Sequence, residues 1–246
     1  SRGLGDVYKR QLHSHRTAEV FFVLSGRWRF FWGRYGKAGE VILEKGDIFN
    51  IPTGIFRGFE NIGKDYGMIM AILGGDDAGG GVIWAPEVLK EAENHGLVLS
   101  EKGKIYDTKI GQTIPSNENL MQPLTENELK KFPEYSSAEV VPNYVARYLD
   151  LYSLSQNNPV IVIGENGKIF DKPGFEVEFV TDQSFMNSKK SYEKDVVFIP
   201  VEGYWMLSLE NHNLILNPGD TFSLPKNNEY TLNPTKPGMA TLYKVI

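Results

Sequence analysis

The chain of 246 residues has a formal net charge of −5, and 41% of its residues are hydrophobic and 23% charged, which is ordinary for a folded globular protein. The acidic balance argues against a nucleic-acid partner, and no apolar run approaches the roughly 18 residues that a membrane-spanning helix needs. The chain contains no cysteine, so a metal ion would have to be bound by histidine and carboxylate side chains. The same absence favours a cytoplasmic location.

The first eleven residues, SRGLGDVYKRQ, match the translation of a common sequencing-library transposon adapter in one reading frame. We therefore expect residues 1–11 to be a non-native scar, and we exclude them from the prediction of the fold. The native chain would then begin near Leu12, inside a strand. Its first strands and any targeting segment would be missing.

Residues 12–84 are predicted to form strands. The stretch EVFFVLSGRWRFFW (19–32) contains two apolar and aromatic runs joined by Ser25-Gly26, which predicts a β-hairpin with a two-residue loop. In that hairpin Phe21 would lie opposite Phe30. The stretch EVILEKGDIFNIP (40–52) repeats the pattern around a turn, and GMIMAIL (67–73) is typical of a short buried strand.

The rest of the chain divides into a linker and a second block of strands. APEVLKEAENHG (85–96) has a proline near its start and a glycine at its end, which predicts a helix, and residues 85–158 as a whole are predicted to be a helical and loop-rich linker. Strand patterns return over 159–246. There, GDTFSLP (219–225) repeats GDIFNIP (46–52) with Gly, Asp, Phe and Pro at identical offsets, which indicates an internal duplication.

One set of residues in the first block falls at fixed spacings. The set comprises His13, His15, Glu19 and Gly26, followed by Gly46, Pro52, Gly54 and Asn61. These residues resemble the two-part signature of the cupin superfamily, in which a further histidine stands where this chain has Arg57. The resemblance implies an all-β fold of double-stranded β-helix (jelly-roll) barrels in two copies. Residues 12–84 would be the first barrel, truncated at its start, and residues 159–246 a degenerate second barrel.

The resemblance also implies a mononuclear metal site. His13 and His15 are two residues apart, so on a strand both imidazoles leave the same face. Together with Glu19 they make a set of two histidines and one carboxylate, which suits Fe(II) first, and also Mn(II), Ni(II), Co(II) or Zn(II). The implied function is a metal-dependent enzyme, a dioxygenase-like oxidoreductase that acts on a small anionic or aromatic substrate.

The pocket around this set is predicted to be apolar. If Glu19 faces the barrel interior, its hairpin partner Trp32 faces inward too, and so do Phe21 and Phe30. Aromatic walls around one polar cluster are typical of small-molecule sites.

Arg57 has three interpretations. In the first, the metal is held by the two histidines and Glu19, and Arg57 clamps an anionic group of the substrate through its planar fork. In the second, Arg57 pairs with Glu19 and replaces the metal, which leaves a non-catalytic small-ligand-binding or sensing barrel. In the third, Arg57 points away from the site, and another residue, which the sequence does not identify, completes it.

The outer face of the same strands is also apolar. It carries Val20, Phe22, Leu24 and Phe31, and we expect it to pack on the second barrel or on another subunit, so that a homodimer is possible.

The second barrel is not expected to bind a metal. The residues at its four ligand positions are Lys190, Tyr192, Val196 and Tyr230. These side chains do not make a divalent-metal site, so we expect one site per chain.

Overall fold

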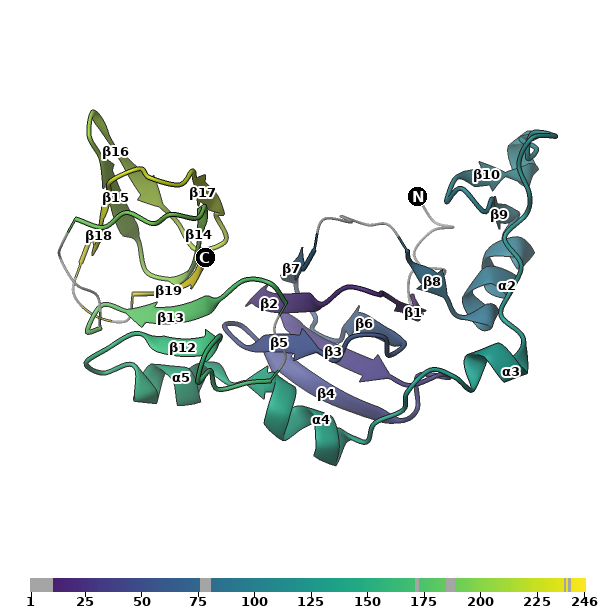
Figure 1. Cartoon of the computed structure of the whole chain (residues 1–246), viewed down its shortest axis with the longest axis horizontal. Helices are drawn as coiled ribbons and strands as arrows, with labels where there is room; N and C mark the ends of the chain where they lie inside the picture. The colour runs from purple at the N-terminus through teal and green to yellow at the C-terminus, as the bar shows by residue number, and fades with distance from the viewer. Residues whose placement is uncertain (1–10, 76–80, 171–172, 185–188, 237, 239) are drawn as a thin grey trace.

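The computed structural model of the protein describes residues 11–75, 81–170, 173–184, 189–236, 238 and 240–246. The predicted scar at residues 1–11 therefore lies outside the described residues, except for Gln11. Most of the described strands form two β-barrels that lie side by side, the first in purple and blue and the second in green and yellow (Figure 1). The pairing between strands is antiparallel in both barrels. The predicted all-β fold with two barrels is confirmed.

The first barrel consists of a five-stranded sheet in the order β4-β3-β6-β1-β8 and a four-stranded sheet in the order β11-β5-β2-β7. Their bounds are β1 His13–Ser14, β2 Glu19–Ser25, β3 Arg27–Trp32, β4 Gly39–Glu44, β5 Ile48–Ile51, β6 Arg57–Asn61, β7 Met68–Leu73, β8 Ile83–Trp84 and β11 Val145–Ala146. The segment predicted as a linker thus contributes β11, which pairs with β5 at the edge of the second sheet.

The second barrel repeats this plan with a five-stranded sheet in the order β12-β13-β19-β14-β17 and a three-stranded sheet in the order β16-β15-β18. Their bounds are β12 Val160–Ile163, β13 Val177–Thr181, β14 Val196–Glu202, β15 Trp205–Leu209, β16 His212–Leu216, β17 Phe222–Leu224, β18 Thr231–Pro234 and β19 Thr241–Val245.

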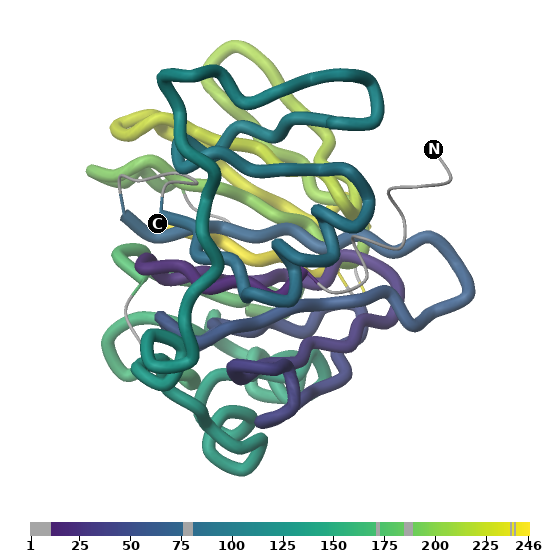
Figure 2. Tube along the Cα trace, turned by 90° about the vertical axis from the view of Figure 1, so that its right-hand side faces the viewer, coloured from purple at the N-terminus to yellow at the C-terminus, as the bar shows by residue number. Residues whose placement is uncertain are grey.

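The described helices lie between the two barrels in the sequence. They are α2 Pro86–Asn94, the 3₁₀ helix η2 Thr108–Ile110, α3 Glu126–Leu129, α4 Ser137–Tyr144 and α5 Tyr148–Leu154. Helix α2 and the hairpin of β9 (Leu97–Leu99) and β10 (Ile105–Asp107) form an arm at the end of the molecule opposite the second barrel, as the teal trace in Figure 2 also shows. None of the described helices combines the length and the hydrophobicity that crossing a membrane would require.

The predicted hairpin at Ser25-Gly26 is wrong. Strand β2 pairs with β5 and β7, whereas β3 pairs with β4 and β6 in the other sheet. The chain therefore crosses from one sheet to the other at Gly26, where φ is +84° and a side chain would collide with the backbone of Gly67. Phe21 and Phe30 still meet, with ring centroids 5.0 Å apart, but they meet across the barrel interior rather than as neighbours in one sheet.

Strand β2 is buried on both faces because the barrels share a core. Its inward residues Phe21 and Val23 pack inside the first barrel, whereas Val20, Phe22 and Leu24 pack against the second. The partners of this outer face include Phe179, Ile199 and Tyr243. The prediction that the outer face packs on the second barrel is confirmed for β2. It is wrong for Phe31, which packs in a separate cluster with Leu12, Phe56, Ala85 and Leu129.

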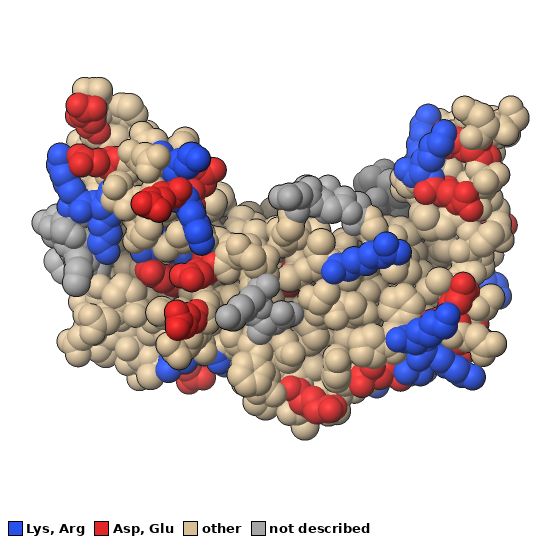
Figure 3. Space-filling model, viewed as in Figure 1, with Lys and Arg blue, Asp and Glu red and all other residues tan. Residues whose placement is uncertain are grey.

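The face of the molecule seen in Figure 3 is hollowed between the second barrel and the arm. On these two projections, Lys and Arg side chains alternate with Asp and Glu side chains, and the body between them is mostly uncharged at this face. Both signs of charge are therefore mixed on this face.

Candidate metal centre

The two histidines of the motif flank the short strand β1: His13 is its first residue, and His15 follows its last. His13 pairs with Arg57 of β6 on one side and with Trp84 of β8 on the other. Its ring contacts that of His15, with the centroids 4.9 Å apart and the planes nearly perpendicular. Both side chains are buried, with 9% of His13 and 6% of His15 exposed.

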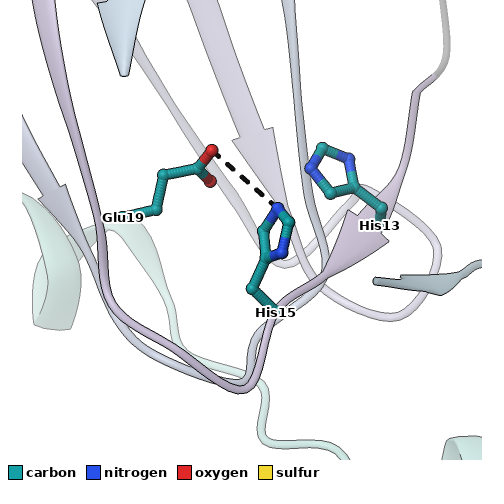
Figure 4. A group of neighbouring side chains, drawn as sticks. All are labelled: His13, His15 and Glu19. Carbon is teal, nitrogen blue, oxygen red and sulfur yellow. Dashed lines mark ion pairs between the residues drawn. The ribbon is translucent and has the colours of Figure 1, made fainter. Parts of the chain in front are cut away.

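Glu19 reaches the histidines from the other sheet of the barrel. It opens β2, where it pairs with Ile51 of β5 and Leu73 of β7. One ligand atom from each of His13, His15 and Glu19 lies within 4.8 Å of the others (Figure 4). The nearest ring nitrogen of His15, Nε2, is 3.9 Å from Glu19 Oε1. The structure thus brings together all three residues that the sequence predicts as metal ligands.

Both imidazoles are neutral at neutral pH. Burial lowers the pKa of His13, and the neighbouring positive charge of Arg57 lowers it further. The same two causes lower the pKa of His15 to about 4. The Nδ1 atom of His13 lies 2.5 Å from the backbone carbonyl oxygen of Gln11, so Nδ1–H donates and Nε2 keeps a free lone pair. The Nδ1 atom of His15 has no hydrogen-bond partner among the described residues.

Arg57 contacts Glu19 in the barrel interior. Its Nε and Nη2 atoms both donate to Glu19 Oε2, at 2.9 and 2.5 Å, and Nη1 donates to the backbone carbonyl of Ile55 at 3.4 Å. Only 1% of Arg57 is exposed, and this burial lowers the pKa of the guanidinium, while Glu19 opposes that shift. The interpretation in which Arg57 points away from the site is therefore wrong. The contact with Glu19 is the one that the second interpretation describes.

A pocket of about 340 Å³ opens onto this cluster. His13, His15, Glu19 and Gln11 form its polar part, and the rest of its wall consists of Phe21, Phe59, Ile69, Ala71, Val82 and Trp84. Of the three aromatic residues predicted for the pocket, the wall includes Phe21. Phe30 and Trp32 are fully buried in the core of the barrel instead. Arg57 is not among the described residues that line the pocket.

Two aromatic wall residues were not predicted. Phe59 is two residues after Arg57 on β6, so the two-residue period of a strand could have placed it on the same inward face. Trp84 reaches the pocket because β8 pairs with β1, and its ring centroid lies 5.5 Å from that of His13. No local sequence signal indicates that pairing.

Comparison with known families shows what the first barrel is similar to. Residues 7–73 match the family model described as a cupin domain. The first barrel is therefore similar to a cupin domain over most of its length. No curated protein matches the chain.

Solved cupin structures resemble the chain over both barrels. Salicylate 1,2-dioxygenase from Pseudaminobacter salicylatoxidans is 15% identical with a TM-score of 0.51, and the match covers 96% of this chain and 66% of that one. Oxalate decarboxylase from Lactobacillus farciminis, solved as a formate complex, is 17% identical with a TM-score of 0.49, and the match covers 96% and 71%. An oxalate decarboxylase mutant from Bacillus subtilis is 14% identical with a TM-score of 0.47, and the match covers 96% and 64%.

Sequence identities this low establish the fold alone. The chain has the architecture of a two-barrel cupin, or bicupin. The chain spans about two thirds of the length of these structures. The activities of those longer proteins therefore enter here only as support for a proposal.

The residues of the cupin site suit a divalent metal. Neutral imidazole nitrogens and a carboxylate oxygen are ordinary ligands of Fe, Mn, Ni, Co and Zn ions. His13, His15 and Glu19 would hold the ion, and the hydrogen bond at His13 Nδ1 is the kind that fixes a ligating imidazole. Of the described residues, these three form the one group of histidines and carboxylates close enough to share an ion.

The second barrel holds a lysine in its interior. Lys244 of β19 lies next to Glu178 of β13, with its Nζ 2.5 Å from Oε2, and also donates to the hydroxyl of Tyr192 at 2.6 Å. Tyr192 in turn stacks on Tyr230. Two of the four positions that correspond to metal ligands thus belong to a cluster built around an ammonium group.

Proposed function

We propose that this chain is a metal-dependent oxidoreductase of the dioxygenase type. It binds one divalent ion at His13, His15 and Glu19, and Fe(II) is the preferred ion. It acts on a small aromatic or anionic organic substrate. The observation that carries the proposal is the position of these three ligands on the wall of an apolar pocket. A set of two histidines and one carboxylate with open positions is the arrangement that non-haem Fe(II) oxygenases use.

The pocket supports a small substrate with an apolar body. A volume of about 340 Å³ is within the range of small-molecule sites. Phe21, Phe59 and Trp84 supply aromatic surface for such a body and exclude water from the reacting centre. A metal held by the three ligands supplies Lewis-acid or redox chemistry at its open coordination positions.

The likeness to salicylate 1,2-dioxygenase agrees with this chemistry by analogy of fold. The anion clamp expected of Arg57 requires the guanidinium to exchange its contacts with Glu19 for contacts with the substrate. The clamp therefore stays a prediction.

The ion pair between Arg57 and Glu19 favours a second candidate function. In it the guanidinium neutralises the carboxylate in place of a metal, and the barrel binds or senses a small ligand without catalysis. The two functions differ in whether the unaltered protein binds metal.

Elemental analysis of the protein, purified without added metal or chelator and again after anaerobic addition of Fe(II), separates the two functions. The variant His13→Ala/His15→Ala removes two of the proposed ligands. The matched control is His95→Ala/His212→Ala, which removes the two histidines outside the site. We expect near-stoichiometric metal in the protein and the control, and none in the first variant. Metal binding that appears only in Arg57→His would establish the second function instead.

A further inference from the structure

We propose that Arg57 is a positioning residue for the metal ligand Glu19: it holds Oε2 of the carboxylate so that only Oε1 is presented to the metal. This inference rests on the proposed metal-dependent function. It assigns to Arg57 neither the clamping of substrate nor the replacement of the metal.

The contacts of Glu19 are divided between its two oxygens. Oε2 accepts two hydrogen bonds from the guanidinium, from Nε and Nη2. Oε1 is the oxygen on the side of His15 Nε2, 3.9 Å away. Charge-assisted hydrogen bonds of this kind are about twice as strong as neutral ones. The carboxylate is therefore fixed in rotation, with one oxygen occupied and the other directed to the imidazoles.

Arg57 is itself held rigidly enough for this role. It lies on β6, the central strand of its sheet, where it pairs with Trp32 of β3 and with His13 of β1. The side chain is almost fully buried, and its third nitrogen is close to the carbonyl of Ile55. Since Glu19 belongs to the opposite sheet, the ion pair spans the barrel and fixes the distance between the two halves of the site.

The charge balance also suits a positioning residue. A buried carboxylate needs a compensating positive charge, and Arg57 supplies it before a metal binds. Because Oε2 lies between the guanidinium and the ligand oxygen, the carboxylate separates the two cations and reduces their repulsion.

The three roles of Arg57 give different results when Arg57 is removed. A substrate clamp predicts unchanged metal affinity and weaker substrate binding. Replacement of the metal predicts that affinity for metal rises. Positioning predicts that affinity for metal falls, because Glu19 is then free to rotate or to turn away from the histidines.

The experiment is an isothermal titration of chelator-treated protein with Co(II), followed by the visible absorption spectrum of bound Co(II), which reports its coordination. The variants are Arg57→Gln and Arg57→Lys. The matched control is Arg29→Gln, which removes an arginine of the same barrel that pairs with Glu40 and Glu60 at the surface. Circular dichroism monitors folding of each variant.

We expect the Kd for Co(II) to rise about 10- to 100-fold in Arg57→Gln, the size of effect typical of groups that orient metal ligands, with a changed spectrum. Arg57→Lys, which keeps the charge but loses the planar fork, should give an intermediate Kd, and Arg29→Gln an unaltered one. If Arg57→Gln does not fold, Arg57→Lys decides by the same criteria.

Two results would overturn the proposal in distinguishable ways. If the unaltered protein and the Arg57 variants bind Co(II) with the same Kd and spectrum, Arg57 has no positioning role, and the metal-dependent function stands. If the unaltered protein binds no Co(II), whether or not the variants do, both the positioning role and the metal-dependent function fail.

Discussion

The hydroxyl of Tyr243 donates a hydrogen bond of 2.6 Å to the backbone carbonyl of Gly46, and this bond links the second barrel to a turn of the first. Tyr243 is fully buried on β19, and Gly46 lies in the turn between β4 and β5 with φ at +86°. Burial raises the pKa of Tyr243 well above its usual value, so the hydroxyl stays protonated and remains a donor. The shared core therefore contains a directional contact between the barrels.

Replacement of Tyr243 by Phe should destabilise the whole protein. The change removes one hydrogen bond and leaves the carbonyl of Gly46 without that donor in a buried place, which costs about 1–3 kcal/mol. Urea unfolding measures the loss. The control is Tyr204→Phe, which removes a hydroxyl from a side chain that is 54% exposed and should cost little. Equal losses in the two variants would contradict the role of the contact.

The metal-free protein should lose stability as the pH falls from about 6.5 to about 4. The folded-state pKa of His15 is about 4 and its ordinary value is 6.5, so within this window the unfolded chain binds more protons than the folded one. Stability that is present above pH 6.5 is then lost on acidification, by at most about 3.5 kcal/mol for His15 at about 1.4 kcal/mol per pKa unit. The lowered pKa of His13 acts in the same direction.

Urea unfolding at several pH values, compared between the protein and the variant His13→Gln/His15→Gln, measures this contribution. The carboxylates that titrate in the same window are common to both proteins, so the difference reports the histidines. An identical pH dependence would show that the histidines are not buried in the neutral form.

Lys244→Met should destabilise the second barrel. The change leaves Glu178 without its partner, which for a buried pair costs about 3–5 kcal/mol, and we expect less here because 22% of the Glu178 side chain is exposed. The double variant Lys244→Met/Glu178→Leu should recover much of the loss, since well-packed apolar residues can replace such a pair. Thermal unfolding of both variants tests this. A double variant no more stable than the single one would show that the ion pair itself is not the source of the effect.

Ala71→Trp should close the pocket without removing the proposed metal site. Ala71 lies on the pocket wall on β7, and a bulky side chain there would occupy space that an aromatic ligand needs. Benzoate should then no longer perturb the spectrum of bound Co(II), whereas the small anion azide should still do so. Co(II) content itself should be unchanged. If benzoate perturbs the Co(II) spectrum of the variant as much as that of the unaltered protein, ligands reach the metal by a route other than this pocket.

The sequence alone determined the fold class and the candidate ligand set. The alternation of apolar residues and the spacing of the cupin signature predicted β-barrels, and the two-residue separation of His13 and His15 placed both on one face. Glu19 then stood at the spacing that the same signature requires for a third ligand. These are local properties of a strand, so they can be predicted from the sequence without knowing which strands pair.

Only the tertiary structure decided the partners across the barrel. The pleat of a strand gives the face of each side chain but not its neighbour, so it predicted a hairpin where β2 and β3 in fact belong to different sheets. For the same reason the sequence did not predict Trp84 as a pocket residue, because Trp84 reaches the site through the pairing of β8 with β1. The sequence also left three interpretations of Arg57 open. The barrel closes so that β6 lies opposite β2. This arrangement brings the guanidinium of Arg57 to Oε2 of Glu19.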